Sequence, residues 1–113
     1  MATYDNLPVY KASYDLLVEI FRFVKTFSRE YKHTLGESIK KEMIILISHI
    51  YRANSDFSKR KEHLSGARES LELIRLYLRL TKDLNQINLK SFVFLNTIIE
   101  SVSKQLFSWQ KSM

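Results

Sequence analysis

The chain has 113 residues, with 18 lysine and arginine residues against 12 aspartate and glutamate residues, a net charge of +6, and no cysteine. The absence of cysteine excludes a disulfide scaffold and a thiolate metal site, and no apolar run approaches the roughly 20 residues of a transmembrane helix. This composition predicts one cytoplasmic domain, residues 1–113, without a membrane partner, and its positive charge favours an anionic partner such as nucleic acid.

The first predicted helix covers residues 8–27. Pro8 suits the first turn of a helix, where its missing N–H costs nothing, and Asn6 or Asp5 is a candidate cap. Its apolar residues recur at helical spacing: Leu16, Ile20, Val24 and Phe27.

A polar joint over residues 28–34 precedes the second predicted helix, residues 35–54. Thr34 and Glu37 have the spacing of a capping box, although Gly36 is an unfavourable residue for a first helical turn. Five consecutive apolar residues, 43–47, cover more than one turn, so Ile44 or Ile45 must point away from the core. Exposed apolar surface on a small domain predicts self-association.

The third and fourth predicted helices cover residues 59–84 and 89–111. Ser55 or Ser58 is a candidate cap for the third helix, and Asn88 for the fourth. Their apolar seams are Leu64, Ala67, Leu71, Ile74 and Leu78, and then Phe92, Leu95, Ile99, Val102, Leu106 and Trp109. Four amphipathic helices with short joints predict an all-α, antiparallel up-down-up-down four-helix bundle.

Basic side chains form a stripe on the third helix. On a helical wheel Arg68, Arg75, Arg79 and Lys82 fall within roughly 60° of one another, and Glu72 borders them. Guanidinium groups suit bidentate contact with phosphates, so the stripe is a candidate nucleic-acid interface. The alternative is a solvated face whose arginines pair with Glu69, Glu72 or Glu42 and serve solubility alone.

Other residue patterns carry less information. Lys59, Arg60 and Lys61 form a basic triplet at a helix start, where the helix dipole disfavours cations unless an anion is near, and a solvated loop edge is the simpler interpretation. The three histidines lack metal-ligand spacing, and no nucleotide-binding or nucleophile motif occurs. We therefore expect a protein without catalytic activity, metal or cofactor.

Four sequence motifs carry a family resemblance. L-P-V-Y-K-A-S-Y-D-L-L at residues 7–17 resembles the opening of the bacterial four-helix bundles encoded in 23S rRNA intervening sequences. Y-K-x-T-L-G-E-x-I-K at 31–40, I-Y-R-A-N-S at 50–55 and A-R-E-x-L-E-x-I-R-L-x-L-R-L at 67–80 resemble one branch more closely, the accessory variability determinant (Avd) family of diversity-generating retroelements.

The resemblance implies a homopentameric barrel of basic bundles that associates with a reverse transcriptase and with nucleic acid during mutagenic copying of a template RNA, without a catalytic site. It also implies a basic role for Arg68, Arg75 and Arg79, and for Arg52 in the motif at 50–55. Two alternatives stay open: an intervening-sequence type of bundle, and a structural oligomerisation bundle that binds no nucleic acid.

Overall fold

The computed structural model describes residues 7–112, and helices dominate this range. The long helices are α1 (Pro8–Val24), α3 (Leu35–Ser55), α4 (Arg60–Asp83) and α5 (Leu89–Lys111). A one-turn helix, α2 (Arg29–Lys32), lies between α1 and α3, and a 3-10 turn, η2 (Phe57–Lys59), lies between α3 and α4. Residues 7–112 contain no strand, so the predicted all-α fold class is confirmed.

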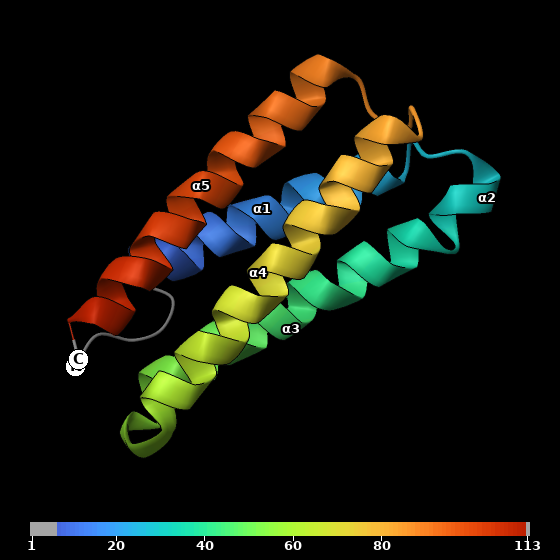
Figure 1. Cartoon of the computed structure of the whole chain (residues 1–113). Coiled ribbons are helices and arrows are strands. Elements are labelled where there is room, and N and C mark those ends of the chain that lie inside the picture. The colour runs from blue at the N-terminus through green and yellow to red at the C-terminus, as the bar shows by residue number, and fades with distance from the viewer. Residues whose placement is uncertain (1–6, 113) are drawn as a thin grey trace.

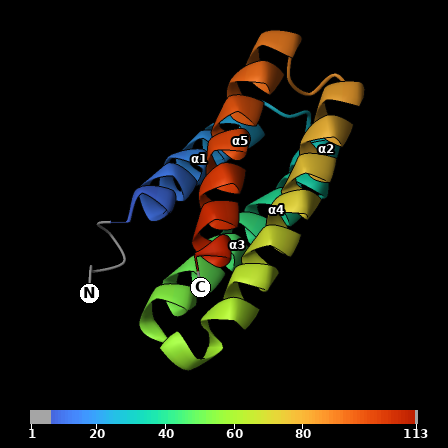
Figure 2. The same cartoon turned by 60° about the vertical axis from the view of Figure 1, so that its left-hand side comes forward.

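The four long helices form an antiparallel bundle (Figure 1). Both α1 and α4 pack against α3 and α5, and the pairing of α3 with α4 is the most extensive. Successive long helices run in opposite directions, so the η2 turn lies at the same end of the bundle as the start of α1 and the end of α5 (Figures 1 and 2). Within residues 7–112 no helix is both long and apolar enough to cross a membrane.

Each long helix contributes one apolar stripe to a shared core. The most deeply buried large side chains are Leu16, Ile20, Ile39, Met43, Leu46, Ile50, Leu64, Ile74, Leu95, Ile99, Val102 and Leu106. Those on α1, α4 and α5 follow the predicted seams, which are confirmed except at the two ends of the last one, where Phe92 and Trp109 are only partly buried. The helical period of the apolar residues therefore fixes which face of each helix points inward.

The first predicted helix is shorter than expected. It ends at Val24, and the predicted joint at 28–34 contains α2. Phe27 lies beyond the helix and is still buried against the core, at 6% exposure, because the chain turns back over the bundle end. The candidate caps Asn6 and Asp5 lie outside the described residues.

Two predicted caps are wrong and one is confirmed. The Thr34 hydroxyl donates to the Glu30 carbonyl at 2.9 Å and makes no cap bond to α3, because α2 places an acceptor four residues earlier. Ser55 lies inside α3, and Ser58 donates to Asp56 Oδ1 at 2.8 Å, so neither side chain caps α4. Asn88 does cap α5, since its Oδ1 accepts from the Ser91 backbone N–H at 2.8 Å.

Gly36 is required by a close approach between helices. A Cβ atom at this position would lie 2.6 Å from Val24 Cγ1 and 3.3 Å from the Tyr31 carbonyl oxygen. The end of α1 and the turn of α2 thus pass directly over the first turn of α3. The glycine that weakens the helix locally allows the connection to pack.

We expect Gly36→Ala to destabilise the protein, although alanine is favoured over glycine in a helix by about 1 kcal/mol. Overpacking of this kind costs about 1–3 kcal/mol, so the midpoint of urea unfolding should fall. Ser38→Ala, at an exposed position in the same region of α3, is the matched control and should leave the midpoint nearly unchanged. A Gly36→Ala variant more stable than the parent would contradict the packing explanation.

Candidate nucleic-acid interface

The basic stripe of α4 lies along the edge that faces α5. Arg68 Nη1 donates to Gln110 Oε1 at 2.6 Å, and its guanidinium carbon lies 5.4 Å from the centre of the Phe107 ring. Lys82 Nζ lies 5.0 Å from the centre of the Phe92 ring. Positions 68, 75 and 82 are seven apart, which is two helical turns, so they share one side of the helix. We call Arg68, Arg75, Arg79 and Lys82 the α4 basic edge.

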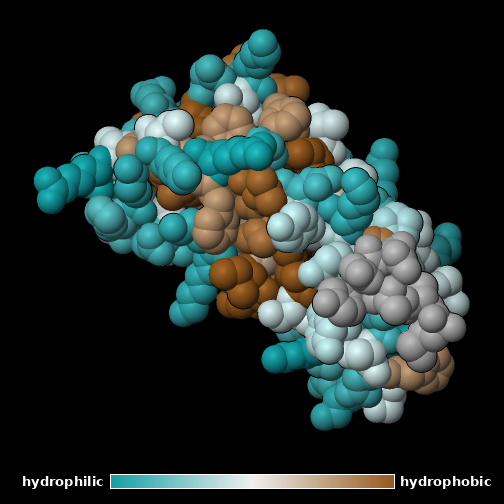
Figure 3. Space-filling model, turned by 180° about the vertical axis from the view of Figure 1, so that it is seen from behind, coloured by the Kyte–Doolittle hydropathy of each residue, from teal (hydrophilic) through white to brown (hydrophobic). Residues whose placement is uncertain are grey.

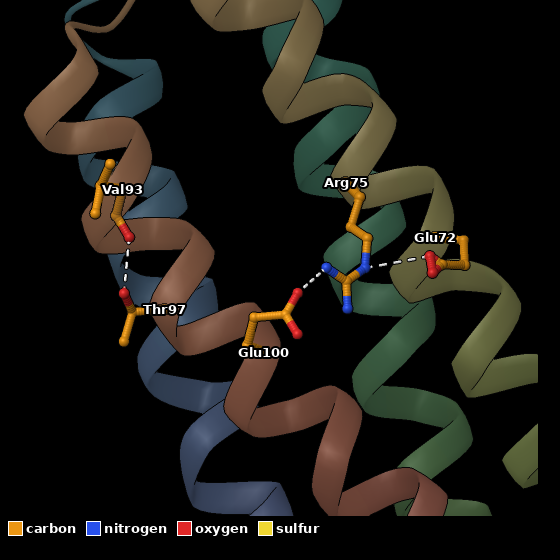
Figure 4. A network of polar contacts seen from close by, with 5 residues as sticks. All are labelled: Glu72, Arg75, Val93, Thr97 and Glu100. Atoms are coloured by element: carbon orange, nitrogen blue, oxygen red, sulfur yellow. Dashed lines mark hydrogen bonds and ion pairs between the residues drawn. The ribbon is translucent and has the colours of Figure 1, made fainter.

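Arg75 is held by carboxylates on both helices (Figure 4). Its Nη1 donates to Glu100 Oε1 on α5, and its Nε lies 3.2 Å from Glu72 Oε2 on α4. The contact with Glu72 is an ion pair by distance, but the Nε–H does not point at the carboxylate in a hydrogen-bonding direction. The hydrogen bond from Arg75 and its positive charge lower the pKa of the Glu100 carboxyl.

These contacts give Arg75 a structural role. The pairing with Glu72 is the one that the solvated-face alternative anticipated, whereas Glu100 lies 25 residues away on another helix and no sequence spacing indicates it. The carboxylates offset the charge of Arg75 locally, so any contact of this side chain with phosphate has to compete with them. Its contribution to binding remains a prediction.

Arg79 and Arg52 differ from Arg75 in their surroundings. Both side chains are exposed, and the described part of the chain records no ion pair or hydrogen bond for either of them. Arg79 continues the α4 basic edge. Arg52 lies on α3, whereas the recorded contacts of the α4 basic edge are with α5, so the structure does not bring Arg52 into the edge.

Most of the positive charge is not neutralised inside the fold. Among residues 7–112, recorded ion pairs engage only Arg22, Lys40, Arg75 and Lys82 of the 18 lysine and arginine residues. The remaining cations leave a positive field around the bundle, and such a field attracts polyanions.

The histidines do not form a metal site in the described range, where no group of three or more histidine, aspartate or glutamate side chains could hold an ion. Sequence spacing did not indicate that His49 and His63 come together, with ring centres 6.1 Å apart. The His49 ring packs against Gly66, and burial, followed by the charges of His63 and Arg52, lowers its pKa.

Apolar side chains also remain outside the core. Ile44 is 53% exposed, which confirms that the run at 43–47 points one residue outward, and Leu76 on α4 is 59% exposed. Figure 3 views the molecule from behind and shows a continuous hydrophobic area. This is the face formed by α1 and α3, which lie behind α5 and α4 in Figure 1. Apolar area of this kind is typical of a surface that contacts another protein.

These features define the chain as a basic, all-α four-helix bundle that exposes cations along one helix edge and apolar residues elsewhere. The sequence profile of the bAvd-like family matches residues 9–113, and the chain belongs to this family. The resemblance to the accessory variability determinants is thereby confirmed, and membership indicates an Avd-type accessory protein. No curated protein sequence matches the chain.

We expect Glu100→Gln to lower the thermal unfolding midpoint at pH 7 and to have no effect in acid. Because the folded state lowers the pKa of Glu100, this carboxylate stabilises the fold above its ordinary pKa, and the contribution is lost as the pH falls below about 4. Thermal unfolding between pH 3 and pH 7 measures the difference, with Glu69→Gln as an exposed control on α4. A difference between parent and variant that is constant with pH would exclude the ion pair as its cause.

Proposed function

We propose that this protein is a non-enzymatic accessory protein of a diversity-generating retroelement. In this function an oligomer of basic bundles binds nucleic acid, either the template RNA or its cDNA, together with the reverse transcriptase of the element. The observation that carries the proposal is the family match over residues 9–113. The net charge of +6 supports the nucleic-acid part, as does the fact that most of the lysine and arginine side chains have no ion pair recorded within residues 7–112.

The α4 basic edge is the surface we propose for phosphate contact. Arg79 is exposed and unpaired within the described range, so it can contact a phosphate directly. Arg68 is exposed with a neutral partner, so it can exchange this hydrogen bond for one to a phosphate at little cost. Arg75 holds α4 against α5 and keeps the edge in shape. Arg52 would contribute from α3 as a separate contact.

The exposed apolar residues support the protein-partner part of the proposal. Ile44 on α3 and Leu73, Leu76 and Leu80 on α4 remain partly in water in the single chain, which is the condition expected of protein interfaces. The pentamer is the assembly that the family resemblance implies. A symmetric ring would repeat the α4 basic edge once per protomer, and a repeated edge releases more counterions from a bound strand than a single edge does.

A second function is favoured by one observation. The carboxylates of Glu72 and Glu100 occupy Arg75 at the centre of the edge, as expected if the charge serves solubility and orientation. In that case the protein is a structural oligomerisation bundle that binds the reverse transcriptase without nucleic acid.

Charge reversal separates the two functions. We expect Arg68→Glu combined with Arg79→Glu to weaken binding of RNA or DNA by at least about tenfold near 0.15 M salt, because local phosphate contacts are lost. The matched control is Lys25→Glu with Lys41→Glu, which makes the same change in net charge at exposed residues of the α1–α3 side. Filter binding measures affinity, and circular dichroism verifies that both variants keep their helices. An equal loss in the two variants would remove the α4 basic edge as the interface.

A further inference from the structure

The turn between α3 and α4 exposes an aromatic ring. Phe57, the first residue of η2, is 75% exposed, the highest value among the large hydrophobic side chains of residues 7–112. The η2 turn lies at the end of the bundle where the chain reverses direction between α3 and α4 (Figures 1 and 2). Leaving so much apolar surface in water is unfavourable, and a bound partner that covers the ring would remove this cost.

An immobilised guanidinium group supports one face of the ring. The Arg60 guanidinium carbon lies 4.8 Å from the centre of the Phe57 ring and 5.6 Å from the centre of the Trp109 ring. Arg60 Nε donates to the Ala53 carbonyl at 2.7 Å, and Nη2 donates to the Asn54 carbonyl at 3.3 Å. Arg60 thus satisfies carbonyls at the end of α3 and cannot move freely. The exposure of Phe57 then belongs chiefly to the opposite face and the edge of the ring.

Next to the ring the three basic residues outnumber the two acidic ones, Asp56 and Glu62. Lys59 and Lys61 flank Arg60, their side chains are exposed, and the described residues record no ion pair for either amine. Asp56 is the nearest acid in sequence, and its carboxylate accepts from the Ser58 hydroxyl. The basic triplet spans the start of α4, where the helix dipole adds positive potential, so an anion bound beside the ring would relieve an unfavourable arrangement.

We propose that Phe57, supported by Arg60 and flanked by Lys59 and Lys61, is a stacking platform for a base of single-stranded nucleic acid. An aromatic face surrounded by cations is the combination that binds single strands: the ring stacks on a base while the lysines contact the adjacent phosphates. The fixed position of Arg60 holds the ring in place before binding, which reduces the ordering cost. A duplex cannot use the platform in this way, because its bases are already stacked and paired.

This inference rests on the proposed function and adds to it a strand preference and a second contact region. The η2 turn directly precedes α4, and the α4 basic edge lies along that helix. A single strand that follows α4 from the η2 end of the bundle therefore passes both. RNA and single-stranded DNA share the chemistry that the platform reads, and both are used in the test.

The experiment compares Phe57→Ala with the unaltered full-length chain by fluorescence anisotropy on labelled single-stranded RNA, single-stranded DNA and a duplex of the same sequence. We expect about tenfold weaker binding to both single strands and less than about a twofold change on the duplex. Phe57→Trp should retain full affinity, whereas Phe57→Leu, which keeps apolar area but removes the ring, should behave as Phe57→Ala does. Phe94→Ala on α5 is the matched control, since this ring is 47% exposed and the described residues record no cation over it.

The outcomes separate this inference from the function on which it rests. Unaltered protein that binds no nucleic acid near physiological salt overturns both. Protein that binds single strands equally well with and without the Phe57 ring overturns the platform alone, as does an equal loss on the duplex. A change in sedimenting mass with unchanged affinity would assign the ring to a protein interface instead. Thermal unfolding of each variant verifies that the exposed substitution leaves the fold intact.

Discussion

Burial of one apolar stripe per helix around a shared core is the constraint on which the rest of the molecule depends. Once Leu71, Ile74 and Leu78 of α4 point inward, the rotation of that helix is fixed. Arg68, Arg75 and Lys82 then lie at the boundary with α5, because each directly follows a buried residue. Leu76 faces outward. The placement of the α4 basic edge and the exposure of Leu76 follow from that rotation.

The α4–α5 boundary shows how a basic protein can keep its charge and still pack. Arg75 is paired with carboxylates on two helices, whereas Arg68 meets a neutral amide and Lys82 lies over an aromatic ring. Ion pairs this close to water contribute little to stability on their own, so the Arg75 network serves mainly to orient the two helices. The neutral amide of Gln110 positions Arg68 without cancelling its charge, whereas Lys82 also lies 3.9 Å from Asp83 Oδ1.

Sequence patterns predicted those features that depend on one helix at a time. The 3.6-residue period located the buried seams, and the amide of Asn88 located the start of α5. The sequence could not indicate features that depend on how helices meet. The Thr34 hydroxyl bonds backward because α2 places a carbonyl there, and Gly36 is needed because Val24 passes above it.

The candidate sites show the same division. The α4 basic edge was visible in the sequence because its members share one helix face, but its carboxylate partner Glu100 was not, because it lies on α5. The basic triplet was visible as a charge run, yet its relation to an aromatic ring was not. Arg60 reaches Phe57 and Trp109 only after the chain reverses at η2 and α5 returns to the same end of the bundle.

Counterion release on binding is the property that most directly distinguishes a nucleic-acid-binding bundle from a merely soluble basic one. It is measured as the slope of the logarithm of the binding constant against the logarithm of the salt concentration, for single-stranded RNA and the unaltered protein. Contact with several phosphates predicts a linear fall with a slope steeper than about −3. A slope near zero, or no binding at low salt, would contradict the assignment of the exposed cations to nucleic acid.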